Sequence, residues 1–127
     1  MTLVEALVAL VLFAIFMAGA GKILLSHRGL GDITREHYTA VNIAKNRAEL
    51  ARTFNYDALP DFRETDVLVD ASGDPITGNR GTYRRSTVVD LVNNVAELTV
   101  TVDIRNHKTL QFEGAHQEVK TYIAFHP

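Results

Sequence analysis

The sequence predicts an α+β fold in which one long N-terminal helix packs on a small antiparallel sheet. Three observations support this prediction: an apolar N-terminal segment, a following segment with helical periodicity, and alternating apolar and polar residues after Pro60. The chain has 127 residues, the length of one domain with at most a short appendage. We therefore divide it into an apolar helix over residues 1–28 and a globular domain over residues 29–127.

The N-terminal segment, MTLVEALVALVLFAIFMAGAGKILL, carries one charged side chain, Glu5, before Lys22. From Ala6 to Gly21 no side chain is charged or forms hydrogen bonds, and with its apolar flanks this stretch approaches the ~20 residues that span a bilayer. A secretory signal peptide would begin with basic residues and have a shorter apolar core. No basic residue precedes the apolar run here, so it fits neither a signal peptide nor a positive-inside anchor.

Two explanations account for the carboxylate of Glu5. Thr2 and Glu5 have the spacing of a capping box, in which a hydroxyl and a carboxylate satisfy N–H groups of the first helical turn. The helix dipole also favours a negative charge at this end. An ionisable group at the head of a long apolar run is, however, costly in a membrane and usually functional. Both explanations stay open on the sequence.

The first ten residues, MTLVEALVAL, resemble the mature N-terminus of type IV pilins and of the related type II secretion pseudopilins. In that family a short basic leader is removed, the new N-terminal residue is N-methylated, and a glutamate at the fifth position precedes an apolar helix. The resemblance implies that Met1 is the processed, N-methylated residue. It also implies that Met1, Thr2 and Glu5 form the assembly motif, in which Glu5 pairs with the N-terminal amine of a neighbouring subunit. A cleaved leader would explain the missing basic residues.

The resemblance departs from the family at Lys22, where many pilins have a proline. Gly19 and Gly21 are the nearest helix-weakening residues, each costing about 1 kcal/mol relative to Ala. The resemblance implies that they let the helix unwind in an assembled filament. The alternative is that these glycines, with Ala14 and Ala18, allow close approach of neighbouring helices; the two roles are compatible.

An amphipathic helix is predicted over residues 32–56. Gly29 and Gly31 permit a bend or break before it, and Asp32 is placed to cap its start. Mostly small residues then recur at spacings of three and four and form a narrow stripe: Tyr38, Val41, Ala44, Ala48 and Ala51. Charged residues, including Arg47, lie off this stripe.

A loop region over residues 57–81 and antiparallel strands over residues 83–124 follow. The loop region contains a short apolar run at residues 65–69 and the turn-rich stretch DASGDPITGNRG. Strands are predicted at residues 83–89, 97–105 and 118–124, with turns at residues 93–94 and 106–108. The ending, an LTVTVDIRN strand and then a VKTYIAF strand, further resembles the small minor pilins and pseudopilins.

Asp70, Ser72 and Asp74 alternate like the oxygen ligands of a calcium loop. An EF-hand would need Gly at its sixth position and Glu at its twelfth, where this chain has Pro75 and Gly81. We therefore expect a solvated hairpin loop, keep calcium as the alternative, and expect no other cofactor.

No constellation of residues indicates catalysis, so we expect a protein that is not an enzyme. The chain has no Cys, which excludes disulfides, thiolate zinc sites and covalent haem, and its five His have no ligand spacing. The net charge is -2, so no overall basic field favours nucleic acid. We interpret Arg80, Arg84 and Arg85 as a small, solvated basic spot, and we do not expect DNA binding.

The resemblance implies a structural subunit of a type IV pilus or pilus-like filament. Its partners would be copies of itself, related pilins, the prepilin peptidase and the pilus assembly machinery. It would reside in the inner membrane before assembly and then in a periplasmic or extracellular filament. Two alternatives stay open: a minor pseudopilin of a type II secretion system, and a monomeric, membrane-anchored binding module.

We expect that removing the first 28 residues leaves a soluble, folded and monomeric domain. The composition changes at Lys22, and the predicted stripe and strands can form a core of their own. Circular dichroism measures the folding of this fragment, and sedimentation measures its association state. An unfolded or obligately oligomeric fragment would contradict the division at residue 28.

Overall fold

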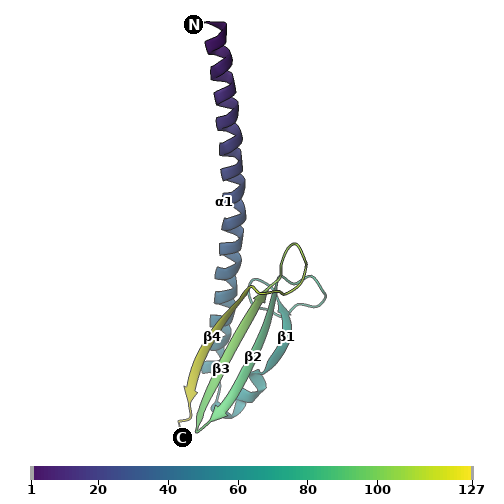
Figure 1. Cartoon of the computed structure of the whole chain (residues 1–127). Helices are drawn as coiled ribbons and strands as arrows, with labels where there is room; N and C mark the ends of the chain where they lie inside the picture. The colour runs from purple at the N-terminus through teal and green to yellow at the C-terminus, as the bar shows by residue number, and fades with distance from the viewer. Residues whose placement is uncertain (1, 127) are drawn as a thin grey trace. The chain divides into compact units, whose positions relative to one another are not determined.

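The computed structural model describes residues 2–126, with the backbone alone at residues 27 and 28. It contains, in chain order, α1 (Leu3–Arg52), the 3-10 helix η1 (Tyr56–Phe62), β1 (Glu64–Val69), β2 (Tyr83–Val92), β3 (Val95–Ile104) and β4 (His116–Ala124). The strands form one antiparallel sheet in the order β1-β2-β3-β4 (Figure 1). The predicted α+β class, a long helix with a small antiparallel sheet, is therefore confirmed. The chain divides between Arg35 and Glu36 into two compact units.

Helix α1 is continuous from Leu3 to Arg52, so the predicted break at Gly29 and Gly31 and the separate helix start at Asp32 are wrong. A glycine weakens a helix but keeps its N–H and C=O groups, so the hydrogen-bond ladder continues through it; only proline removes a donor. The helix also ends four residues earlier than predicted.

Two regular elements lie in the segment predicted as a loop, residues 57–81. The 3-10 helix η1 contains Pro60 and buries Leu59 and Phe62. β1 pairs with β2 at Glu64 and again from Val67 to Val69, and the register shifts between these two places. The apolar run at residues 65–69 was too short to predict a strand, because pairing with a distant strand, not local pattern, stabilises it.

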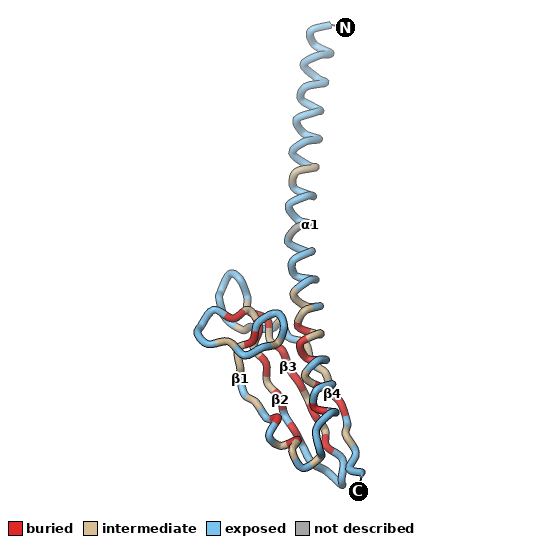
Figure 2. The backbone as a smooth tube through the Cα atoms, turned by 180° about the vertical axis from the view of Figure 1, so that it is seen from behind, coloured by how far each residue is buried: buried red, intermediate tan, exposed pale blue. Residues whose placement is uncertain are grey.

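The core of the second unit lies between one face of the sheet and the C-terminal part of α1 (Figure 2). β3 follows the predicted alternation, since Leu98, Val100 and Val102 are fully buried and their neighbours are half-buried. Asn93 and Asn94 join β2 to β3 with φ of 49° and 62°, the left-handed conformation that a two-residue hairpin turn requires. The predicted turn at residues 93–94 is confirmed.

The buried face of α1 is rotated relative to the predicted stripe. Its buried apolar residues are Ala40, Ile43, Ala44, Ala48 and Ala51. Tyr38 is 69% exposed, so its assignment to the stripe was wrong, and Val41 is only half-buried. The predicted stripe was correct at its three alanines, whose small side chains let the helix axis approach the sheet closely.

A buried ion-pair network centred on Glu64 joins α1, β1 and β2. Arg85 donates from Nε and Nη2 to the two carboxylate oxygens of Glu64, each at 2.8 Å, and the Thr87 hydroxyl donates to Oε2 at 3.1 Å. Arg47 on α1 places its Nη2 3.1 Å from Oε1. The side chains of Arg85 and Glu64 are only 6% and 14% exposed.

The network controls the pKa values of its members. Burial raises the pKa of Glu64, but hydrogen bonds from Arg85 and Thr87 and the charges of Arg85 and Arg47 outweigh it, so this pKa lies below its ordinary value. The pKa of Arg47 also lies below its ordinary value. Burial is the main cause, the charge of Glu64 opposes it, and the neighbouring charge of Arg85 adds to it.

The predicted solvated basic spot is wrong for two of its three arginines. Arg85 is buried in the network, where Glu64 neutralises it. Arg84, on the opposite face of β2, binds Asp103 at 2.8 Å and lies 3.4 Å from Asp66. Carboxylates distant in the sequence supply both partners, so a local charge count could not reveal them.

Replacing Glu64 with Gln should lower the free energy of unfolding by about 3–5 kcal/mol, because it leaves two shielded guanidinium groups without a counter-charge. Because the folded-state pKa of Glu64 is depressed, its contribution is present above an unfolded pKa of about 4.3 and is lost as the pH falls through the folded value. Urea unfolding of the full chain in detergent, followed by circular dichroism between pH 7 and pH 3, measures both effects.

Glu49→Gln is the matched control, because Glu49 on α1 is 68% exposed and pairs with Arg52 at the surface. It should change the free energy of unfolding by less than about 1 kcal/mol. Equal losses in the two variants would show that the network contributes no more than a surface pair.

Candidate membrane-spanning and assembly segment

The first turn of α1 is closed by a capping box. The Thr2 N–H donates to Glu5 Oε2 at 3.1 Å, and the Glu5 N–H donates to Thr2 Oγ1 at 3.4 Å. The Thr2 hydroxyl lies 3.5 Å from the same Oε2. These reciprocal bonds satisfy early helical N–H groups, as the spacing predicted. Among the described residues, no hydrogen bond uses Glu5 Oε1, so the cap occupies one carboxylate oxygen and leaves the other.

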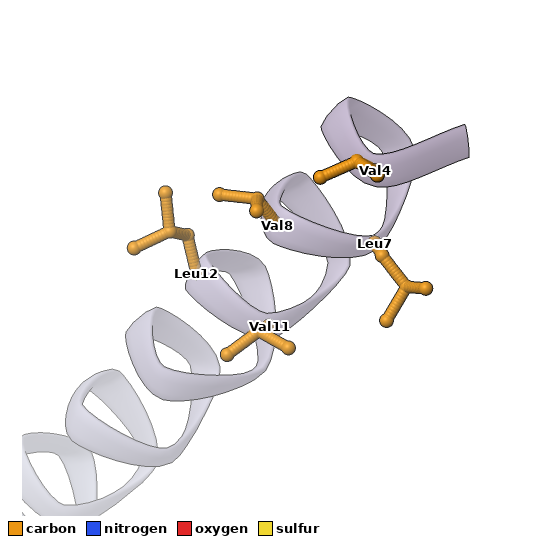
Figure 3. Close-up of a pocket in the computed structure, with 5 residues that line it drawn as sticks. All are labelled: Val4, Leu7, Val8, Val11 and Leu12. Atoms are coloured by element: carbon orange, nitrogen blue, oxygen red, sulfur yellow. The ribbon is translucent and has the colours of Figure 1, made fainter. Parts of the chain in front are cut away.

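The helix that follows is apolar on all sides. Every large apolar side chain from Leu3 to Leu25 is exposed over 52–81% of its surface. Figure 3 shows five of them projecting from the first turns of α1: Val4, Leu7, Val8, Val11 and Leu12. Burying one such side chain contributes about 1.5–3 kcal/mol. A helix that is apolar all round therefore requires an apolar environment, which is either lipid or other protein.

The length of this segment matches a bilayer. By length and composition, α1 is long and apolar enough to cross a membrane. Leu3 to Gly21 covers about 28 Å at 1.5 Å per residue, close to the ~30 Å of a hydrocarbon core. Glu5 and Lys22 are about 25 Å apart along the axis, so in a spanning helix each charge would lie near one surface of the hydrocarbon layer. There Glu5 keeps contact with polar groups.

The other residues that the resemblance assigns to assembly are in or before this helix in the sequence. Gly19 and Gly21 are part of the continuous α1, and a Cβ added at either would contact nothing within 4 Å. Their predicted unwinding concerns an assembled filament and stays a prediction. Met1, the residue predicted to be N-methylated, lies outside the described residues.

Asp70, Ser72 and Asp74, the ligands of the alternative calcium site, lie in the loop between β1 and β2. Asp70 Oδ1 accepts the backbone N–H groups of Ser72 and Asp74 at 2.9 and 3.0 Å, so this carboxylate closes the turn. In the part of the chain that the structure describes, no group of three or more His, Cys, Asp or Glu is placed to hold a metal ion. Calcium binding stays the alternative to the predicted solvated loop.

Sequence reasoning missed the cluster of Arg47, Glu64 and Arg85. The prediction that Arg47 lies off the stripe was wrong, because Arg47 lies three residues after Ala44 and four before Ala51 and its side chain is only 16% exposed; this spacing was a signal in the sequence. Arg85 likewise occupies an alternate position of β2 that faces the core, like Tyr83 and Thr87 on either side of it. Glu64 offers no local signal, because its role depends on partners from two other elements.

No protein-family model, curated protein or solved structure matches the chain. The function is therefore inferred from the residues and the geometry of this segment.

Replacing Leu12 with Arg should reduce membrane insertion sharply. Leu12 lies midway between Leu3 and Gly21, where an arginine costs about 2.5–3.5 kcal/mol of insertion free energy. Leu25→Arg is the matched control, because Leu25 has similar exposure but follows Lys22, where a long basic side chain can reach the headgroups. Flotation with liposomes measures the membrane-bound fraction. Equal retention of both variants would contradict the assigned span.

Proposed function

We propose that this chain is a structural subunit of a type IV pilus or a pilus-like filament, held in the membrane by α1 and assembled through it. One observation carries the proposal: an apolar helix of bilayer length begins with a carboxylate, and the same helix continues into a second unit, where it packs on a small antiparallel sheet. The resemblance of MTLVEALVAL to mature pilin N-termini supports the same function.

In this proposal the apolar surface of residues 3–25 has two successive environments. Lipid covers it before assembly, and the equivalent helices of neighbouring subunits cover it in the filament. Transfer between them loses little hydrophobic free energy, because helix surfaces and lipid tails are similarly apolar. Small residues at positions 14, 18, 19 and 21 favour close helix packing in the second environment.

Glu5 selects the correct stagger between subunits. An unpaired carboxylate in an apolar filament core costs several kcal/mol, and an opposite charge recovers much of that cost. The α-amino group titrates near pH 8 in model peptides, so the Met1 amine of a neighbour carries this charge at neutral pH. The capping box is compatible with the pair, since the cap uses Oε2 and leaves Oε1 for the ammonium group. The pair contributes specificity more than overall stability.

The rival function is a monomeric, membrane-anchored binding module. The capping box favours it, because helix capping accounts for Glu5 without a second subunit. A minor pseudopilin of a type II secretion system stays an alternative within the proposed family.

Glu5→Gln and Glu5→Ala separate these functions. Gln keeps an oxygen that can cap but has no charge, so under the ion-pair proposal it should slow filament assembly, and Ala should abolish it. Both variants should still insert into membranes. Filament yield and membrane-bound protein, measured in the same cells, give the two quantities.

Glu49→Gln serves as the control, because it removes an exposed carboxylate from the same helix. It should leave filament yield unchanged. Normal filaments from Glu5→Ala would refute the ion pair, and a wild-type chain that stays monomeric in the membrane would favour the anchored module.

A further inference from the structure

A half-open hollow of about 260 Å³ lies beside the ion-pair network in the second unit. Its lining includes Asn46, Arg47 and Leu50 from α1, Glu64 from β1, Arg85 from β2 and the loop residues 72–75. The hollow therefore combines apolar walls with two guanidinium groups and is separate from the apolar N-terminal segment.

The charges at the buried end of the hollow are unbalanced. Arg47 and Arg85 contribute two positive charges, and Glu64, which lies between them, contributes one negative charge. All three side chains are at most 16% exposed, so water screens the remaining positive charge poorly. The second carboxylate of the lining, Asp74, is exposed and forms no ion pair with either arginine in the part of the chain that the structure describes.

Not every N–H group of the Arg47 guanidinium has an acceptor among the described residues. Its Nη2 donates to the Phe62 carbonyl at 3.1 Å and lies near Glu64. Its Nε is buried without an acceptor among the described residues, and no described hydrogen bond uses its Nη1. Arg85, by contrast, is held by Glu64 on one side and donates from Nη1 to the Gly73 carbonyl at 2.8 Å. Arg85 thus supplies charge at a fixed position, and Arg47 has hydrogen-bonding capacity left over.

We propose that this hollow binds a carboxylate, supplied by a free small acid or by an acidic side chain of a peptide. One negative charge balances the buried cluster of Arg47, Glu64 and Arg85, and a carboxylate oxygen can accept a charge-assisted hydrogen bond from the unused Nη1 of Arg47. A phosphate dianion would bring too much negative charge next to Glu64 and Asp74. Ile43, Leu50 and Pro75 provide apolar contacts for the carbon atoms of the ligand. The inference does not depend on the proposed function.

Titration of the full chain in detergent at constant ionic strength and pH 7 tests the site by NMR. Acetate should shift the Nε–H signal of Arg47 and the backbone signals of residues 72–75, and acetamide, its neutral analogue, should not. Equal shifts from acetate and acetamide would overturn the proposal. An absence of shifts with both acetate and a Glu peptide would also overturn it.

Asp74→Asn gives a test that needs no change to the ion-pair network. Asp74 is exposed, so the variant should fold, and removing its charge should tighten acetate binding about two- to fivefold. Unchanged or weaker binding would refute the site. Arg84→Gln is the control, because Arg84 pairs with Asp103 on the other face of the sheet, and its acetate affinity should equal that of the wild type.

Arg47→Gln should abolish acetate binding in protein whose spectrum remains folded, and retained binding would contradict the proposal. Blocked Gly-Glu-Gly and Gly-Gln-Gly peptides identify the source of the carboxylate. Tighter binding of the Glu peptide than of acetate, with no binding of the Gln peptide, assigns the site to a protein partner. Acetate binding that the Glu peptide does not exceed assigns it to a free acid.

Discussion

The ion pairs of Glu64 join parts of the chain that no short connection brings together. Glu64 lies at the start of an edge strand whose register shifts immediately after it, so few backbone bonds hold this end of β1 to the sheet. Arg85 reaches it from β2 and Arg47 from α1. Because Arg47 must face Glu64, the rotation of α1 about its axis is restricted, and the same rotation turns Ala44 and Ala48 onto the sheet. Charge and packing therefore specify one arrangement of the second unit.

The two units differ in how far they bury their apolar side chains. Residues 36–126 bury a core of apolar side chains between a helix face of small residues and one face of the sheet. Residues 3–25 leave theirs exposed on every side of a single helix, which no fold of this segment alone can bury. The second unit is thus stabilised by its own core, whereas the apolar surface of the first needs lipid or other protein to cover it.

In the proposed filament, Glu5 would serve both a local and an intermolecular role. Its Oε2 accepts hydrogen bonds from Thr2 and so stabilises the first helical turn within one chain. The other oxygen is not needed for the cap, and the carboxylate lies at the end of the apolar segment, where a polar boundary is near. A cap that also positions the carboxylate reduces the conformational freedom lost when a cation from another subunit binds it.

The sequence by itself determined the features that depend on near neighbours. The apolar run and its Thr2–Glu5 cap, the alternation of β3 and the Asn93-Asn94 turn all follow from residues a few positions apart. Only the tertiary structure decided that β1 is a strand, that α1 is rotated toward Arg47, and that Arg85 is buried and neutralised. The physical reason is that these features depend on pairs far apart in the sequence: Glu64 with Arg47 and Arg85, and β1 with β2. A local pattern shows which residues are charged or apolar, but not which distant partner makes their burial favourable.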